Sequence, residues 1–295
     1  MIAVLSASGG IGSAVASSLL ALGRPVRVVG RHPDKLRRLT ALGAEPHIGS
    51  LLDEDFLAEV FSGAKAAYVM IPADFGAPDY RASQNGIGEA IARALDRAGV
   101  PRAVNISSLG AHTGDDNGVV GGLHDQERRL NRLARTAVLH LRPAYFMENM
   151  LGALPSLRRT GTVALPLRPE RAFPAVAVRD IADRVVKHLL LPEYDHGQTV
   201  DLLGPRAMSP QEMTVILGRA AGRPDAAYVQ TGFDEFRAGL SHAGMSADGA
   251  RSLTDYMRCL DDGRLCELAV RTAESTTPTT FEQLAEALVQ RQTTN

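Results

Sequence analysis

A run of small residues near the start of the chain has the composition of a phosphate-binding turn. Ser6, Gly9 and Gly12 follow a short apolar segment and precede a stretch rich in alanine and leucine. Small residues at this spacing allow a tight strand-to-helix turn and a close approach of backbone to a pyrophosphate, and the helix N-terminus offers free N–H groups to the anion. The turn therefore predicts a dinucleotide site. The expected contacts come from Ser6, Ser8, Gly9, Gly10, Ile11 and Gly12.

The residues that follow the second expected strand bear on the choice of cofactor. NAD-specific folds place an acid there, whereas this chain has Arg31. A guanidinium pairs with a 2′-phosphate and cannot accept a hydrogen bond from a ribose diol, so NADP(H) is expected in preference to NAD(H). Two alternatives stay open: Arg31 is only a solvated side chain, and the turn binds no ligand. Ser50 and Leu51 follow the third expected strand, where the adenine edge would lie.

Apolar segments of β type alternate with helical patterns over the first half of the chain. Strands are expected at Ile2–Leu5, Val26–Val29, Glu45–Ile48, Ala66–Ile71, Ala103–Ile106 and Ala137–Leu141. Helices are expected at Gly10–Leu22, Pro33–Leu42, Glu54–Phe61, Ser83–Ala98 and His124–Ala134. This alternation predicts an α/β fold with a doubly wound parallel sheet, whose carboxyl edge carries the ligand.

After Pro143 the elements become shorter and are interrupted by glycine and proline. Helices are expected there at Arg179–Leu191, Pro210–Ala221, Phe233–His242 and Phe281–Gln290. The change predicts a Rossmann domain over residues 1–150 and a smaller C-terminal α/β substrate lobe over residues 151–295, with some segments of the second part returning to the Rossmann sheet.

Composition restricts the class of ligand. The chain has 295 residues, 45% of them hydrophobic, which is enough for a large core, and its formal net charge is −1. Such a balance provides no field for nucleic acid or for anionic lipid, so a small-molecule substrate is expected. We expect no membrane segment and a cytoplasmic location. The eight histidines are scattered and indicate no metal site, and Cys259 and Cys266, two turns apart in one expected helix, are expected to pack rather than to bond.

Two further motifs carry a resemblance to a known family. They are Asn105-Ile106-Ser107-Ser108 and the segment from Leu139 to Asn149, which reads LHLRPAYFMEN. With the turn and Arg31, they make the chain similar to the NmrA-like family of atypical short-chain dehydrogenases/reductases. Weaker matches at Val178–Ala182, Gly204–Pro205 and Thr276–Phe281 extend the resemblance over nearly the whole chain.

The resemblance implies a role for individual residues. The turn from Ser6 to Gly12 would hold the pyrophosphate and Arg31 the adenosine phosphate. Ile71 and Pro72 would edge the nicotinamide half. The other side of that half would be lined by Ser107, Pro143, Tyr145 and Phe146.

The chain departs from the family pattern at three places. Ser6 stands for the first glycine of the turn, and Ser50 for an acid often found after the third strand. Short-chain dehydrogenases also use a Tyr-x-x-x-Lys pair as acid and cofactor anchor, but no tyrosine or lysine occurs between Ser107 and Tyr145. The usual acid chemistry is therefore absent in its usual form.

Other side chains are candidates for that chemistry. His124, at the expected start of a helix, would donate a proton, and Ser107 would bond the substrate oxygen. The alternatives are that His124 only caps the helix and that Ser107 only ends its strand. Arg128 lies one turn on and would orient a phosphate or the substrate carbonyl, while Glu127 is expected in the first turn as a complement to the helix dipole.

Aromatic side chains offer walls for a flat substrate. Phe75, Tyr80, Tyr145 and Phe146 are the candidates, although each fits the core equally well. Asn149 is counted with the substrate-binding residues, although with Glu148 it is expected to tie its loop together rather than to react.

The interpretation that follows is an NADPH-dependent reductase of a quinone, an enone or a similar conjugated carbonyl. Such acceptors make little demand on a protein acid, because the product anion is stable. Two alternatives stay open: an NADP(H) sensor that binds a protein partner and turns nothing over, and a biosynthetic isomerase, dehydratase or cyclase. The sequence also leaves a homodimer open.

Overall fold

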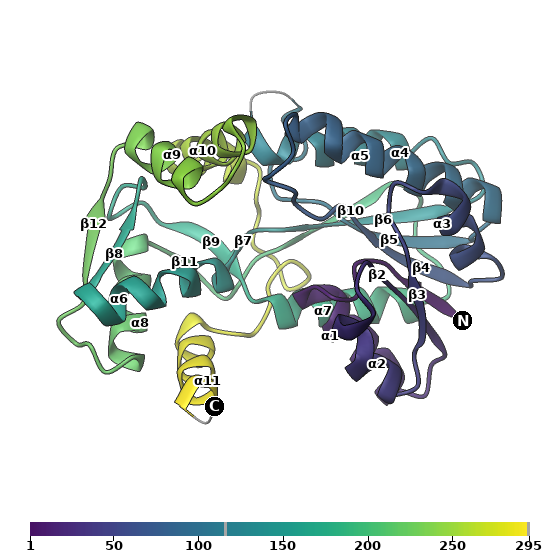
Figure 1. Ribbon diagram of the computed structural model, residues 1–295, viewed down its shortest axis with the longest axis horizontal. Coiled ribbons are helices and arrows are strands. Elements are labelled where there is room, and N and C mark those ends of the chain that lie inside the picture. Colours follow the sequence, from purple (N-terminus) through teal and green to yellow (C-terminus); the bar gives the residue numbers. More distant parts are fainter. Residues whose placement is uncertain (115–116, 294–295) are drawn as a thin grey trace.

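The computed structural model describes residues 1–114 and 117–293, with side chains up to residue 287. A seven-stranded sheet with the order β10-β6-β5-β4-β1-β2-β3 forms its centre, and all neighbouring strands in it are parallel (Figure 1). The doubly wound α/β fold is thereby confirmed. Its strands are β1 Ile2–Val4, β2 Val26–Gly30, β3 Glu45–Ile48, β4 Ala66–Met70, β5 Arg102–Ile106, β6 Ala137–Pro143 and β10 Gln198–Leu202.

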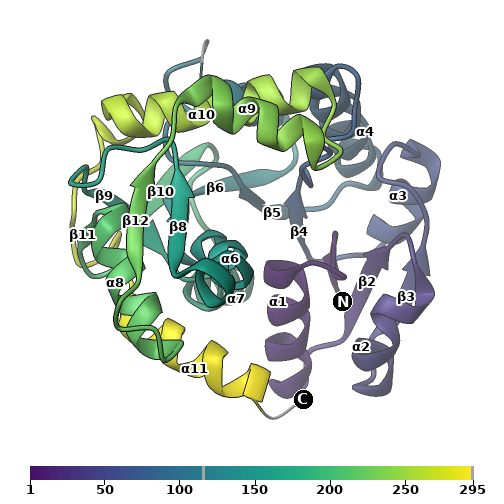
Figure 2. The ribbon, with the colours of Figure 1, turned by 60° about the vertical axis from the view of Figure 1, so that its left-hand side comes forward.

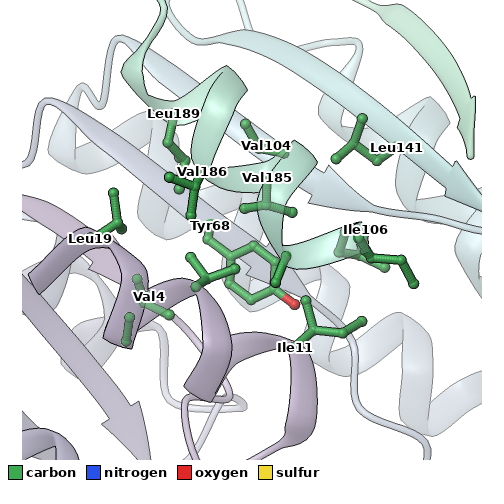
Figure 3. Close-up of a cluster of buried hydrophobic side chains, with 14 of the residues drawn as sticks. Val4, Ile11, Leu19, Tyr68, Val104, Ile106, Leu141, Val185, Val186 and Leu189 are labelled. Carbon is green, nitrogen blue, oxygen red and sulfur yellow. The ribbon is translucent and has the colours of Figure 1, made fainter. Parts of the chain in front are cut away.

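Helices cover both faces of this sheet because its strands are apolar on both sides. One face packs against α1 Gly10–Ala21, α2 Arg37–Ala41 and α7 Val178–Leu190. The core on that side surrounds the fully buried Tyr68 and includes Val4, Ile11 and Val185 (Figure 3). The other face packs against α3 Glu54–Phe61, α4 Tyr80–Ala98 and α5 Gly121–Leu130.

The remaining elements form a second core beside the carboxyl end of the sheet (Figures 1 and 2). Its strands are β7 Tyr145–Phe146, β8 Thr162–Leu165, β9 Phe173–Val176, β11 Ala207–Met208 and β12 Ala227–Gln230. Its helices are α6 Leu154–Thr160, α8 Pro210–Ala220, α9 Phe233–His242, α10 Ala247–Asp262 and α11 Phe281–Thr293. Two elements beyond residue 150, α7 and β10, belong instead to the large sheet and its helical layer.

Helix α5 begins and ends earlier than the sequence predicts. It runs from Gly121 to Leu130, so His124 lies in its second turn and not at its start. The glycines at its beginning are helical because α4 packs closely there: a Cβ on Gly122 would overlap the side chain of Gln84. The helix ends at Leu130 and does not continue toward Ala134. The next residue, Asn131, accepts a hydrogen bond from His140 through its side-chain oxygen.

Three other predicted helices also change. The segment expected as one helix at 33–42 divides into a 3₁₀ turn, Pro33–Leu36, and α2, because Leu36 is drawn into the core over Gly30. Helix α4 starts three residues early at Tyr80, where Asp79 caps it by accepting from the N–H of Ala82 at 2.8 Å. The helix expected to hold both cysteines ends at Asp262, so Cys266 lies outside it in the 3₁₀ turn Arg264–Cys266.

A buried polar cluster joins β5, β6 and α5. His140, with no exposed surface, lies 3.1 Å from Asn105 Nδ2 through Nδ1 and 2.9 Å from Asn131 Oδ1 through Nε2. The amide donates and the amide oxygen accepts, so the imidazole is neutral with its proton on Nε2. Burial lowers the pKa of His140 to about 4, although the nearby Glu127 acts in the opposite direction.

The cluster makes folding sensitive to acid. Because the folded state resists protonation of His140 and the unfolded chain accepts a proton near pH 6.5, stability is lost as pH falls through that range. The expected loss between pH 8 and pH 5 is about 2 kcal/mol. Urea unfolding at the two pH values measures it: His140→Gln should flatten the dependence, whereas His242→Gln, at an exposed site, should not. Equal slopes in all three proteins would contradict the assignment.

Candidate active site

The turn from Ser6 to Gly12 lies at the carboxyl end of β1, with strands on both sides holding it. Leu5 donates its N–H to Tyr68 of β4 and Ala7 to Val29 of β2. The first N–H groups of α1, as in any helix, have no intrahelical acceptor. Because the capping residue Gly9 has no side chain, no side-chain cap occupies these N–H groups either. These donors meet the requirement of an anion site at a helix N-terminus.

Ser6 shows both the strain and the polarity of this turn. Its φ is +51°, in the left-handed region that favours glycine, and it is the position where the family pattern has glycine. Its hydroxyl is buried, and no hydrogen bond to it is found among the described residues. An orphaned hydroxyl at this position fits a ligand with acceptor oxygens, such as a phosphate.

The glycines of the turn differ in what they do. A Cβ on Gly12 would lie 2.6 Å from the Ser6 carbonyl oxygen, so this glycine is needed to close the turn itself. A Cβ on Gly10 would only reach ordinary contact with Val178 at 3.5 Å, and Gly9 is exposed, with 3.3 Å to the Ser6 oxygen. The space in front of Gly9 and Gly10 is therefore open to a ligand, whereas Gly12 serves the fold.

Arg31 lies just beyond the end of β2 and is exposed. Within 1–114 and 117–293 it makes no hydrogen bond or ion pair, whereas Arg37 is paired with Asp34 at 2.7 Å. A cavity of about 500 Å³ extends from the turn along α1 and is bordered by Arg38 and Arg179. Arg31 follows β2, and Arg38 borders the cavity that begins at the turn; neither has an acidic partner among the described side chains.

The residues expected near the adenine lie on the next loop. Ser50 is exposed, and its hydroxyl accepts from the N–H of Leu52 at 3.2 Å, so it stabilises its own turn. Leu51 is half-buried and packs against the core beneath α3 and α4. A contact of either residue with a cofactor stays a prediction.

The segments expected around the nicotinamide follow three neighbouring strands. Ile71 and Pro72 follow β4, Ser107 follows β5, and Pro143 ends β6. Ser107 donates its N–H to the Leu141 carbonyl at 2.8 Å, and Leu109 donates to that of Pro143 at 3.0 Å. Because β4, β5 and β6 are adjacent in the sheet, these segments lie together at its carboxyl edge.

Glu127 has a different role from the one the sequence predicts. It lies in the second half of α5, far from the positive end of the helix dipole, and is 6% exposed. Arg142 donates to both of its oxygens, at 2.8 and 2.5 Å. Burial acts to raise the pKa of Glu127, but Arg142 and the nearby Ser107 outweigh it and the pKa is lowered. Glu127 is therefore a paired anion and not a proton donor.

Ser107 keeps its hydroxyl available. It is 3% exposed and lies beside Glu127, yet in the part of the chain that the structure describes no group completes a hydrogen bond of standard geometry with its Oγ. Arg142 was not expected as a site residue from the sequence, although it lies within the quoted segment LHLRPAYFMEN. Its position at the end of a buried strand, where an arginine needs an acidic partner, is the signal that would have found it.

His124 is half-buried on the face of α5 that also carries Glu127. Its Nδ1 lies 2.7 Å from the carbonyl oxygen of Ala111, so Nδ1–H donates and Nε2 is left for another partner. A Cβ on Gly114 would lie 3.6 Å from both Cε1 and Nε2 of the ring. Arg128 is exposed, and its role toward a substrate stays a prediction.

The aromatic candidates separate into two groups. Phe75 and Tyr80 are stacked, with ring centroids 5.3 Å apart and an interplanar angle of 11°. Tyr145 is buried and packs edge-on against Phe173 in the second core, so its ring cannot form a substrate wall. Phe146 is half-buried against the core beneath α1 and α7.

The loop after β7 is held to α7. Glu148 accepts from the N–H of Val178, the first residue of α7, at 2.9 and 3.1 Å, and thereby caps a helix that has no cap of its own. This is the tying role expected of it. Asn149 is exposed, and its role toward a substrate stays a prediction.

Neither a metal site nor a membrane span is found in the part of the chain that the structure describes. Its residues contain no group of three or more His, Cys, Asp or Glu side chains arranged to hold a metal ion. No helix among the described residues has the length and apolar character needed to cross a membrane.

Comparisons with known proteins agree with the fold. The model of the NmrA-like family matches residues 1–282. An NAD(P)H azoreductase of Xenophilus azovorans is 30% identical over 260 residues, which cover 87% of this chain and 85% of the relative.

Two solved structures are similar over nearly their whole length. One is an NADPH-dependent quinone oxidoreductase of Escherichia coli complexed with NADPH, with a TM-score of 0.82, 20% identity and coverage of 98% of this chain and 99% of that one. The other is the triphenylmethane reductase of Citrobacter sp. complexed with NADP(H), with a TM-score of 0.78, 17% identity and coverage of 98% and 100%. The structures show the shared fold, and the match over 282 residues shows more: the chain belongs to the NmrA-like family.

Proposed function

We propose that this protein is an NADPH-dependent reductase of quinones, enones or similar conjugated carbonyls. The observation that carries the proposal is the pairing of the glycine-rich turn at the end of β1 with Arg31, an exposed guanidinium without a described acidic partner, at the end of β2. The azoreductase relative and the two reductase structures support the same class of reaction.

The residues present fit NADP(H). The N–H groups at the start of α1 and the orphaned Ser6 hydroxyl would bind the pyrophosphate. Arg31 would pair with the 2′-phosphate, and Arg38, which borders the cavity along α1, would assist. Ile71, Pro72 and Pro143 would border the nicotinamide. When bound, NADPH supplies a hydride.

The chain's own residues would orient the acceptor and handle the proton. The Ser107 hydroxyl, held near the paired Glu127, would bond the acceptor oxygen. His124 carries a proton at Nδ1 that is committed to Ala111, so only the imidazolium, protonated at Nε2, can donate to a product anion. A quinone needs this donor least, because its phenolate product is stable in water. The missing Tyr-x-x-x-Lys pair is consistent with such an acceptor.

The acceptor class has one further candidate. The relative that is 30% identical is an azoreductase, and azo compounds, like quinones, are flat and conjugated. A test panel therefore includes an azo dye beside quinones and enones. The sensor and isomerase alternatives predict no oxidation of NADPH by any of them, and the sensor predicts tight NADP(H) binding that alters association with a protein partner.

Arg31→Ala tests the cofactor part of the proposal. Loss of a charged hydrogen-bonding partner should weaken NADPH binding by about 1.5–3 kcal/mol and leave NADH binding nearly unchanged. Titration of the variant with both cofactors measures the difference. Arg37→Ala is the matched control, because Arg37 is already paired with Asp34. Equal weakening of both cofactors, or a native preference for NADH, would contradict the assignment.

A further inference from the structure

The start of α10 is hydrogen bonded to the segment 74–80, which comprises the later part of the loop after β4 and the first residue of α4. In the sequence, 168 residues separate the partners Tyr80 and Asp248. Ser246 donates its N–H to the carbonyl of Phe75 at 2.9 Å and its hydroxyl to that of Ala77 at 2.6 Å. Asp248 Oδ2 accepts from the N–H of Tyr80 at 2.8 Å. Figure 2 shows α9 and α10 lying over the end of the sheet from which α4 begins.

Glycines allow α10 to approach this closely. A Cβ on Gly249 would overlap the backbone of Phe75, so helix and loop are in direct backbone contact. A Cβ on Gly118, whose φ is +60°, would overlap the backbone of α10 at Ser252. Gly118 immediately precedes α5, the helix of His124. α10 therefore contacts the beginnings of both helices that flank the candidate site.

The same loop carries the stacked pair of aromatic rings. Tyr80 is 3% exposed and Phe75 is half-buried against it. Beyond the bonds to α10, the described hydrogen bonds that order the part of this segment before α4 are local. The side chain of Asp74 accepts from the N–H of Gly76 at 3.2 Å, and the backbone carbonyl of Asp74 accepts from the N–H of Ala77. The part of this segment before α4 has so few internal hydrogen bonds that it depends on α10 for a single conformation.

We propose that Ser246 and Asp248 are positioning residues that hold the Phe75–Tyr80 pair as one wall of the acceptor site, so that α10 sets the preference for flat aromatic acceptors. The inference rests on the proposed function, since it needs an acceptor beside Phe75. Near-parallel rings present a flat apolar surface on which a conjugated ring system can stack. None of these hydrogen bonds involves the turn from Ser6 to Gly12, so their loss should leave the pyrophosphate site intact.

The experiment compares Ser246→Ala with Ser209→Ala. Both serines cap a helix in the second core. Ser246 accepts from the N–H of Gly249 at 2.9 Å, and Ser209 accepts from the N–H of Glu212 at 3.2 Å. Of the two hydroxyls, only that of Ser246 also donates to the segment 74–80. With 1,4-naphthoquinone, Ser246→Ala should raise KM about tenfold, the equivalent of one lost hydrogen bond, with kcat and the NADPH Kd nearly unchanged. Ser246→Thr should restore KM. Equal KM values for the two alanine variants overturn the proposal.

Amide exchange at Tyr80 tests the positioning role without any turnover. Asp248→Ala removes the acceptor of the Tyr80 N–H and should speed its exchange about tenfold or more. Arg251→Ala removes the exposed ion pairs of Arg251 with Asp248 and Asp255 but keeps that acceptor, so it should leave the exchange rate unchanged. Equal exchange in both variants overturns the positioning role. A native protein that turns over no acceptor contradicts the proposed function, and the exchange result then decides the positioning role by itself.

Discussion

Gly9→Val is expected to abolish NADP(H) binding while the protein stays folded. Gly9 caps α1 at the exposed end of the sheet, with φ −90° and ψ 170°, a conformation that other residues adopt. A valine there would place its branches in front of the first N–H groups of the helix, where the pyrophosphate must approach. Fluorescence titration with NADPH and thermal unfolding measure the two effects.

Gly232→Val is the matched control for that substitution. Gly232 also caps a helix, α9, without a side chain, has an extended conformation and has no atom near its missing Cβ. It should bind NADPH as the native protein does. Unchanged affinity in Gly9→Val would mean that the turn has only a structural role. Gly12 is a poor choice for this test, because its Cβ would strike the Ser6 carbonyl and disturb the turn itself.

His124→Ala is expected to lower turnover about 10²–10⁴-fold with acceptors whose product anion needs an acid, and much less with quinones. Because Nδ1–H is bonded to Ala111, the proton given to the product anion would come from Nε2. Steady-state rates with an enone and a quinone, alongside the NADPH Kd, measure these effects. The Kd should not change.

The control is His242→Ala, which removes a histidine whose Nδ1 makes the same kind of bond, 2.7 Å from the carbonyl of Ala238, on an exposed helix. Activity that persists undiminished in His124→Ala with both acceptors rejects the proton-donor role and leaves the reductase proposal standing.

Periodicity predicted the sheet well because parallel strands buried on both faces are continuous apolar runs, and six of the seven strands of the large sheet were expected near their observed places. The ends of helices were predicted less well. At α5 the decisive factor is the packing of Gly122 against Gln84 on α4, which is a contact between distant residues and leaves no local signal. At α10 the signal existed: Gly263, with φ +92°, ends the helix before Cys266.

The site divides in the same way. The turn and Arg31 are local features and could be placed from sequence alone. The bond between Glu127 and Arg142, and the contact of α10 with residues 74–80, join segments that only the fold brings together. Tyr145 shows the converse: an aromatic residue inside a site motif lies in the core because Phe173, on a later strand, packs against it.

The central claim is that this protein oxidises NADPH with a conjugated acceptor, and the most direct measurement is NADPH oxidation by the native protein across a panel of quinones, enones and an azo dye. We predict turnover with at least one quinone, faster with NADPH than with NADH, and a loss of that preference in Arg31→Ala. Tight NADP(H) binding with no oxidation by any acceptor would contradict the claim and would favour the sensor or the non-redox alternatives.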